Sequence, residues 1–236
     1  MVFPCWVWRK VANKLGLNNS TGTKGESRNA GPFPAVFSPV NETESHGPPH
    51  WVILAGPNGS GKSTTAKILL PPTITFVNAD MIAQEITGLK DTAADLVAGR
   101  MLVNLLDELE ADRADFAVET TLATRKFVPR MERLKSIGYE THLIFMFLES
   151  PELAVERVRA RVRMGGHNVP EETVLRRYYR GINLFFDAYM DQVDTWKLYD
   201  NSRLNDPVRI ASGGKTRPLF VNLPEKWQRI HELAGR

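Results

Sequence analysis

The sequence predicts an α/β fold in which a parallel sheet of about five strands lies between two layers of helices. From Trp51 to Tyr199, short apolar segments alternate with longer segments that have helical spacing. Strands that alternate with helices pair in parallel and are joined by crossover helices, which cover both faces of the sheet. The first apolar segment also leads through a glycine-rich turn into a helix, an arrangement suited to binding phosphate groups.

Five apolar segments are the expected strands: 51–55, 73–77, 116–118, 143–148 and 196–199. Segment 143–148 is the most apolar, which favours the centre of the sheet because a central parallel strand is buried on both faces. Helices are expected at 62–70, 91–110, 125–137, 151–163 and 171–193. The first helix ends where Pro71 and Pro72 interrupt helical hydrogen bonding. A strand at 218–221 and a helix from Pro224 are expected near the end of the chain.

Residues 1–49 are expected to form a flexible amino-terminal arm, and residues 50–236 a folded domain. Between residues 16 and 49, 21 of 34 residues are Gly, Pro, Ser, Thr or Asn. Such a segment buries too little apolar surface to offset the entropy lost on ordering. The chain has no apolar run of about 18 residues and a poor secretion signal, so we expect a cytoplasmic protein without membrane contact.

The segment after the first strand is a complete phosphate-loop motif, Gly56-x-x-x-x-Gly61-Lys62-Ser63. Glycines let successive backbone amides point at phosphate oxygens, and the helix start adds partial positive charge. Lys62 is expected to reach the terminal phosphates, and the Ser63 hydroxyl to join the shell of a Mg²⁺ ion. A nucleotide and Mg²⁺ are therefore expected to bind here, while kinase, ATPase and GTPase all remain open. The expected nucleotide-binding residues are Gly56, Pro57, Asn58, Gly59, Ser60, Gly61, Lys62, Ser63 and Thr64.

Acidic residues follow the second and third expected strands. Asp80 and Glu119 are each preceded by an apolar strand segment, and the carboxyl ends of parallel strands face the crevice in which such sheets bind ligands. Asp80 either accepts a proton from an acceptor hydroxyl, holds Mg²⁺ through water, or caps the next turn. Glu119 either binds acceptor hydroxyls, orders a water on Mg²⁺, or caps a helix. The segment Asp200-Asn201-Ser202 follows the last core strand, near the expected position of the nucleotide base.

Alternating arginines and a glycine-rich loop predict a helical lid over about residues 157–177. Helical spacing puts Arg157 and Arg161 on one face and Arg159 and Arg163 on another. The loop 164–170 contains Gly-Gly and His167, and a second arginine pair, at 176 and 177, lies near the start of the next helix. Such a lid excludes water and supplies positive charge to a transferring phosphate. A solvated arginine face is the alternative.

Taken together, these segments resemble the zeta toxin family of P-loop kinases. The matching residues are Gly56 to Thr64, Asn78-Ala-Asp80, Glu119-Thr-Thr-Leu122, Ser150-Pro-Glu-Leu-Ala154, the lid block through Arg176-Arg-Tyr178, and Leu198-Tyr-Asp-Asn-Ser202. The resemblance implies a fold similar to adenylate-type kinases. It also implies ATP-dependent phosphorylation of a hydroxyl on a small molecule, which for the characterised toxins is UDP-N-acetylglucosamine.

The resemblance implies a role for each matching residue. Asp80 is the expected catalytic base, and Lys62 binds the phosphates. Glu119, Thr121 and His167 are the expected acceptor-binding residues. Arg161 and Arg176 are the expected clamp on the transferring phosphate, with Arg157, Arg163 and Arg177 as alternatives. An antitoxin protein is a partner implied by some family members only.

Three other functions remain open from the sequence. The acceptor could be another hydroxyl compound, such as an antibiotic, a nucleoside or a metabolite. The chain could also be an ATP-dependent switch or binding module whose arm contacts a partner. A kinase for nucleic-acid ends is disfavoured, because the net charge is only +3 and no aromatic and basic patch is evident.

Overall fold

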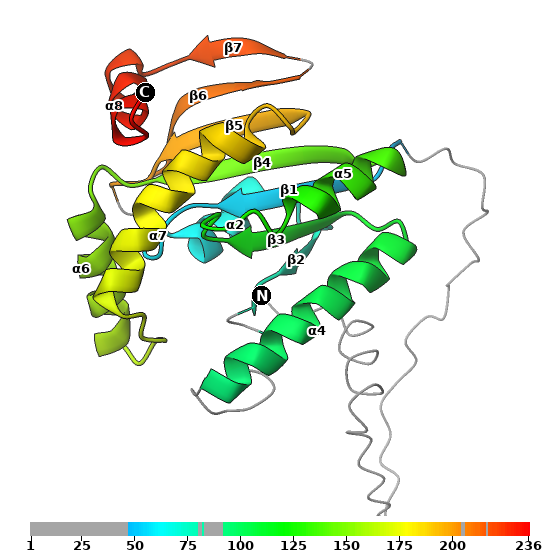
Figure 1. Cartoon of the computed structure of the whole chain (residues 1–236), viewed down its shortest axis with the longest axis horizontal. Coiled ribbons are helices and arrows are strands. Elements are labelled where there is room, and N and C mark those ends of the chain that lie inside the picture. Colours follow the sequence, from blue (N-terminus) through cyan, green and yellow to red (C-terminus); the bar gives the residue numbers. More distant parts are fainter. Residues whose placement is uncertain (1–46, 80–81, 83–91, 204–205, 216) are drawn as a thin grey trace, which may run out of the picture. The chain divides into compact units, whose positions relative to one another are not determined.

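The computed structural model describes residues 47–79, 82, 92–203, 206–215 and 217–236, without the side chains of 92–96 and 98. The residues from Pro48 to Arg236 form one compact unit (Figure 1). The predicted arm lies almost wholly outside the described residues.

A seven-stranded sheet forms the centre of this unit, with the strand order β2-β3-β1-β4-β5-β6-β7. The five strands from β2 to β5 in this order pair in parallel, whereas β6 and β7 pair antiparallel. The predicted parallel sheet is therefore confirmed, with two antiparallel strands added at one edge. The strands are β1 (His50–Ala55), β2 (Thr75–Val77), β3 (Phe116–Thr120), β4 (Glu140–Phe147), β5 (Thr195–Asp200), β6 (Val208–Gly214) and β7 (Arg217–Val221).

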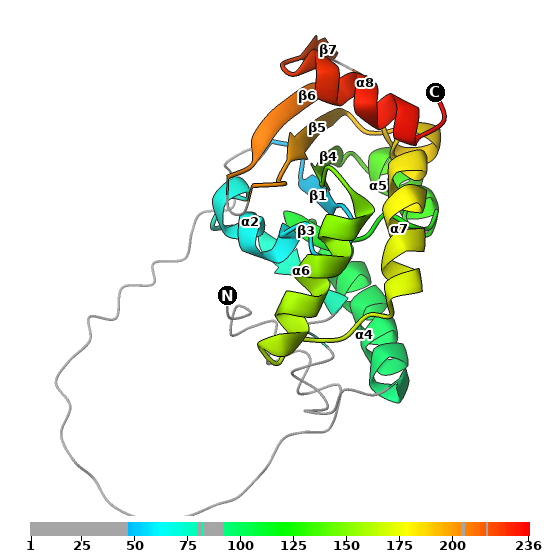
Figure 2. The ribbon, with the colours of Figure 1, turned by 90° about the vertical axis from the view of Figure 1, so that its left-hand side faces the viewer.

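Helices cover both faces of the sheet. Figures 1 and 2 show α2 on one face, and α4, α5 and α7 on the other. The helices are α2 (Lys62–Leu69), α4 (Thr92–Ala111), α5 (Val128–Ser136), α6 (Pro151–Arg163), α7 (Glu171–Leu184) and α8 (Pro224–Leu233). The helix expected at 171–193 ends earlier and continues as a π-helical turn, η1 (Phe185–Tyr189).

The alternation of side chains along each strand divides the core into two layers. Val52 and Leu54 of β1 pack with Ala66 of α2. On the opposite face, the ring centroids of Trp51 and Phe127 are 5.9 Å apart, and those of Phe145 and Phe185 are 5.3 Å apart. Because β1 and β4 are buried on both faces, they form the rigid centre from which the site is built. As predicted from its composition, β4 is the middle strand.

Strand β6 was not expected from the sequence. Its residues, Val-Arg-Ile-Ala-Ser-Gly-Gly, mix charged, small and apolar types, so no apolar run marks it. A Cβ atom at Gly213 would lie 2.9 Å from the Trp196 ring of β5. The glycine thus permits the ring of Trp196 to lie against β6, where the same indole stacks on Trp227 of α8 at 5.7 Å.

In the described parts of the chain, none of the helices combines the length and the apolar character that crossing a bilayer requires.

We expect Leu106→Ala to lower the free energy of unfolding by about 2–5 kcal/mol, because the side chain is 1% exposed and its loss leaves a cavity under α4. Val103→Ala is the matched control on the same helix, since Val103 is 48% exposed. It should change stability by less than about 0.5 kcal/mol. Chemical denaturation of both variants measures the difference, and similar values for the two would contradict this account of α4.

Candidate active site

The phosphate loop joins the end of β1 to the start of α2 and approaches the backbone of β4 closely. Gly56 has φ +138°, and a Cβ atom there would lie 2.3 Å from the Met146 carbonyl oxygen. Gly61 has φ +78° and precedes the first helical residue. Only glycine tolerates such positions without strain. The glycines of the motif are therefore needed for close packing of the loop as well as for phosphate binding.

The loop after β5 supports the phosphate loop from below. The Asn201 side-chain amide, 1% exposed, donates to the Ser60 carbonyl at 2.8 Å. Arg157 of α6 in turn donates to the carbonyls of Asn201 and Ser202, at 2.8 and 2.7 Å. The segment that we expected near the nucleotide base thus contacts the phosphate loop directly.

Asp200 at the end of β5 anchors this supporting loop. Its carboxylate accepts hydrogen bonds from the backbone and hydroxyl of Ser202 and forms an ion pair with Lys226 of α8. Burial alone would raise the pKa of Asp200, but the bonds from Lys226 and Ser202 outweigh burial and lower the pKa below its ordinary value.

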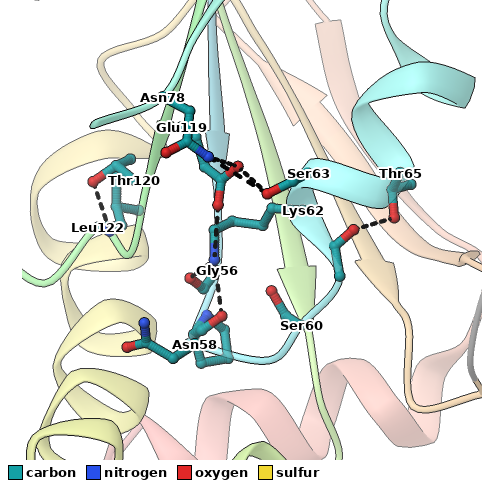
Figure 3. A network of polar contacts seen from close by, with 12 residues as sticks. Gly56, Asn58, Ser60, Lys62, Ser63, Thr65, Asn78, Glu119, Thr120 and Leu122 are labelled. Atoms are coloured by element: carbon teal, nitrogen blue, oxygen red, sulfur yellow. Dashed lines mark hydrogen bonds and ion pairs between the residues drawn. The ribbon is translucent and has the colours of Figure 1, made fainter. Parts of the chain in front are cut away.

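Lys62 is directed into the mouth of the phosphate loop (Figure 3). Its ammonium donates to the carbonyls of Gly56 and Pro57, both at 2.9 Å, and lies 3.7 Å from Glu119 Oε1. The side chain is 6% exposed. The cation is thus placed where terminal phosphates bind in a loop of this kind.

Three side chains from separate elements meet beside Lys62 (Figure 3). Ser63, at the start of α2, donates to Glu119 Oε2 at 2.7 Å. Asn78, directly after β2, donates to the same oxygen at 2.7 Å and lies 3.5 Å from Ser63 Oγ. The carboxyl ends of β2 and β3 therefore bring Asn78 and Glu119 to one edge of the sheet.

The oxygens of Ser63 and Glu119 have the chemistry and spacing of Mg²⁺ ligands. Mg²⁺ prefers octahedral oxygen ligands at about 2.0–2.1 Å, which places adjacent oxygens about 2.9 Å apart. Ser63 Oγ and Glu119 Oε2 are 2.7 Å apart in their hydrogen bond, so both oxygens are close enough to bind one ion in place of that bond.

A cavity of 580 Å³ opens above these residues. Its lining includes five cationic side chains: Lys62, Lys126, Arg157, Arg161 and Arg177. Partial burial and the neighbouring Arg177 lower the pKa of Lys126. Such a concentration of positive charge in one cavity suits a polyphosphate ligand.

The loop after β3 brings Thr121 to the edge of the same cavity. Thr120 Oγ1 accepts a hydrogen bond from the Leu122 amide, and Leu122 has the left-handed φ of +59° while being 1% exposed. Helix α7 packs tightly on this loop, because a Cβ atom at Gly181 would lie 2.7 Å from the Thr121 carbonyl. The loop is therefore packed closely against α7.

The predicted lid residues lie in different places. Arg161 lines the cavity and donates to the His167 carbonyl at 2.9 Å. Arg177 also lines it and donates to Asn58 Oδ1 at 3.4 Å. Arg176 is exposed, and neither it nor His167 is among the lining residues.

Three positions mark the limits of what the sequence predicted. Asp80, the expected base, lies outside the described residues. The sequence did not predict that Asn201 contacts the phosphate loop or that Lys126 lines the cavity. A long-range contact such as that between Asn201 and Ser60 has no local sequence signal.

Comparisons with known proteins match the chain to one protein family. Residues 36–203 match the model of the protein family described as Zeta toxin, which is more than half of the chain. An uncharacterized protein of Haemophilus influenzae is 32% identical over 127 residues, which make up 54% of this chain and 91% of that protein.

Solved structures share the fold. The structure of AvrRxo1-ORF1:AvrRxo1-ORF2 with sulphate ions matches with a TM-score of 0.61 at 16% identity, over 77% of this chain and 63% of that chain. The PezAT toxin-antitoxin system of Streptococcus pneumoniae matches with a TM-score of 0.55 at 18% identity, over 81% of this chain and 88% of that chain. This chain therefore spans less than two thirds of the matched AvrRxo1 chain, and identities this low establish a common fold alone.

We expect the contribution of Asp200 to stability to disappear in acid. Because its pKa is lower in the folded than in the unfolded chain, where it is about 3.9, the contribution is present above about pH 4. It is lost as the pH falls through the lowered folded value. Asp200→Asn should cost about 1.5–3 kcal/mol at pH 7 and progressively less below pH 4, as measured by urea denaturation.

Lys226→Met provides a second test of this prediction. In a chain without Lys226, replacing Asp200 by Asn should lower the free energy of unfolding at neutral pH by less than it does in the unaltered chain. A difference that is independent of pH would show that the aspartate does not stabilise the fold through its charge.

Proposed function

The chain belongs to the zeta toxin family, and from this premise we propose that it is an ATP-dependent phosphotransferase acting on a hydroxyl group of a small molecule. The observation that carries the proposal is the contact of Lys62 and Ser63 of the phosphate loop with Glu119, inside a cavity lined by basic side chains. Family membership and the kinase-like arrangement of the sheet support the same activity.

The proposed reaction is in-line transfer of the γ-phosphoryl group of ATP. The acceptor oxygen forms a bond to the γ-phosphorus while the bond from that phosphorus to the β,γ-bridging oxygen breaks, and ADP leaves. Asp80 is proposed to accept the hydroxyl proton, since it follows Asn78 by two residues at the carboxyl end of β2. Lys62, Arg161 and Arg177 are proposed to neutralise the charge of the transferring group.

Ser63 and Glu119 are the residues that we propose to hold Mg²⁺. When bound there, the ion would neutralise charge on the β- and γ-phosphates. The two carboxylate oxygens of Glu119 have different neighbours. Oε2 accepts hydrogen bonds from Ser63 and Asn78, while Oε1 lies 3.7 Å from the Lys62 ammonium.

A UDP-N-acetylglucosamine-type sugar nucleotide is the proposed acceptor. Glu119 and Thr121 line the same cavity as the phosphate loop, so an acceptor hydroxyl that they bind would lie in the cavity that holds the phosphates. The 580 Å³ volume is within the range of small-molecule sites, about 300–1,000 Å³. Another hydroxyl compound is the main alternative. A switch or binding module is a second alternative, because P-loop switches also hold Mg²⁺ with a loop hydroxyl and a carboxylate.

Three further features remain predictions. The segment 157–177 is proposed to be the lid of a kinase domain that begins near residue 50, preceded by a flexible arm. An antitoxin protein is proposed as a partner, since the matched PezAT structure is of a toxin-antitoxin system. A cytoplasmic location is proposed because ATP is available there.

The purified chain should consume ATP and add one phosphate to UDP-N-acetylglucosamine, as followed by the mass of the product. Asp80→Asn should abolish transfer while leaving ATP binding intact. Lys62→Ala should lower the rate by about 10³-fold or more, because it removes charge stabilisation in the transition state. ATP binding without any product would discredit this acceptor and direct the search to other hydroxyl compounds. Near-normal turnover of Lys62→Ala would refute the kinase proposal itself.

Adjacent arginines allow a matched test of the lid. Arg177→Ala should lower kcat/KM for ATP by about 10²-fold, since Arg177 lines the cavity and contacts Asn58. Arg176→Ala changes the same helix and the same charge but is exposed, so it should cost less than about threefold. The reverse order would return the phosphate clamp to Arg176, as the family resemblance implies.

A further inference from the structure

Two histidines and a glutamate meet at the opposite end of the sheet from the phosphate loop. His50 is the first residue of β1, and Glu140 and His142 lie at the start of β4. The register pairs His50 with Glu140, and side chains two residues apart on a strand share a face. The pairing of two rigid central strands therefore fixes the three side chains as neighbours, about 17 Å along β1 from its other end.

The ligand atoms of these residues are close to one another. His50 Nδ1 lies 3.0 Å from His142 Nε2 and 3.7 Å from Glu140 Oε2. His142 Nε2 lies 4.0 Å from the same carboxylate oxygen. Ligand atoms at about 2.0–2.1 Å from a tetrahedral Zn²⁺ are about 3.3 Å apart. Small rotations of the side chains would bring all three distances to that value.

The second ring nitrogen of His142 is also positioned. Nδ1 lies 2.8 Å from the Thr195 hydroxyl of β5. If Nδ1 carries the proton and donates it to Thr195 Oγ1, the lone pair of Nε2 points at His50 and Glu140. Such an outer hydrogen bond fixes the tautomer and orientation of a metal-binding histidine. The backbone of His50 is also fixed, since its amide donates a hydrogen bond to Asp115 Oδ1 at 2.7 Å.

We propose that His50, Glu140 and His142 form a binding site for a divalent transition-metal ion, with Zn²⁺ as the best-matched ion. Two imidazoles and a carboxylate suit Zn²⁺ and its neighbours in the first transition row, whereas Mg²⁺ and Ca²⁺ prefer oxygen ligands alone. The site is thus chemically distinct from the Mg²⁺ ligands beside the phosphate loop. It does not depend on the proposed kinase activity.

A fourth ligand has room to enter. Glu140 and His142 line a cavity of 760 Å³, which continues over Lys197, Arg209 and Arg217 of the last three strands. The side chains of His50 and Glu140 are 44% and 50% exposed, so an ion can reach the three ligands from solvent. A water or a small anion from this cavity would complete a tetrahedral shell.

A direct hydrogen bond between the two rings is the competing explanation. It accounts for the 3.0 Å distance between His50 and His142. That bond also needs a defined tautomer, with His50 Nδ1–H donating to His142 Nε2, but it leaves unexplained the Glu140 carboxylate, which lies 3.7 Å from His50 Nδ1 and 4.0 Å from His142 Nε2. All three features are explained together by a metal ion, and binding of Zn²⁺ distinguishes the two accounts.

The test uses the full chain without an affinity tag and without ATP, in excess Mg²⁺ so that the phosphate-loop site does not take up Zn²⁺. Competition with a chromophoric chelator gives the Zn²⁺ affinity, and metal analysis after gel filtration gives the stoichiometry. We expect one Zn²⁺ per chain that depends on the three residues. At saturation, with Zn²⁺ at about 100 times its Kd, the midpoint of thermal unfolding should rise by about 5 °C or more.

His50→Ala and His142→Ala should each raise the Kd for Zn²⁺ by about 100-fold, and Glu140→Gln by about 10-fold or more. His167→Ala and His231→Ala are the matched controls, since these histidines lie elsewhere in the described structure, and both should bind Zn²⁺ normally. Circular dichroism of each variant confirms folding, and the exposed His50 makes His50→Ala the safest variant in this respect. Zn²⁺ binding that is absent, or that is unchanged in His50→Ala and His142→Ala, would overturn the proposal.

Discussion

Strand β1 pairs in parallel with β3 on one side and β4 on the other, and this pairing sets the position of the phosphate loop, of Glu119 and of His50. It brings the carboxyl ends of the central strands to one edge, so that the phosphate loop, Glu119 and the loop after β5 are neighbours. It also brings Gly56 against the Met146 carbonyl, so that the loop starts from a fixed point. The amino end of the same pairing places His50 beside Glu140.

The cost of collecting charges at that edge is limited by mutual hydrogen bonding. Glu119 is 14% exposed, and it accepts from Ser63 and Asn78 while Lys62 lies close by. A buried carboxylate or ammonium without such partners would destabilise the fold by several kcal/mol. The same partners leave each group oriented before a ligand arrives, so little reorganisation is needed on binding. Preorganisation and stability are therefore served by the same contacts.

The sequence predicted most of the fold, because the buried strands are apolar runs and the phosphate loop is a local motif. Strand β6 was not predicted, because Gly213 and Arg209 interrupt the apolar pattern expected of a strand. The strand is favoured by packing against Trp196 of the neighbouring strand, which no local pattern reveals. In the site, Lys62, Ser63 and Glu119 were predictable from the motif and from strand ends. The contact of Asn201 with Ser60 joins residues 141 positions apart. Such contacts follow from the topology and not from any local pattern.

Helix α7 contacts both the phosphate loop and the loop after β3. Arg177 contacts Asn58, and Gly181 lies against the Thr121 carbonyl. The helix is a stiff rod, and no space separates Gly181 from the loop that it contacts. If the proposed nucleotide and acceptor each contact one of these two groups, a ligand that shifts α7 at one group also shifts the other group. The two affinities are then linked by one coupling free energy, which is the same in both directions. An acceptor that tightens nucleotide binding would itself be bound more tightly in the presence of nucleotide, by an equal factor.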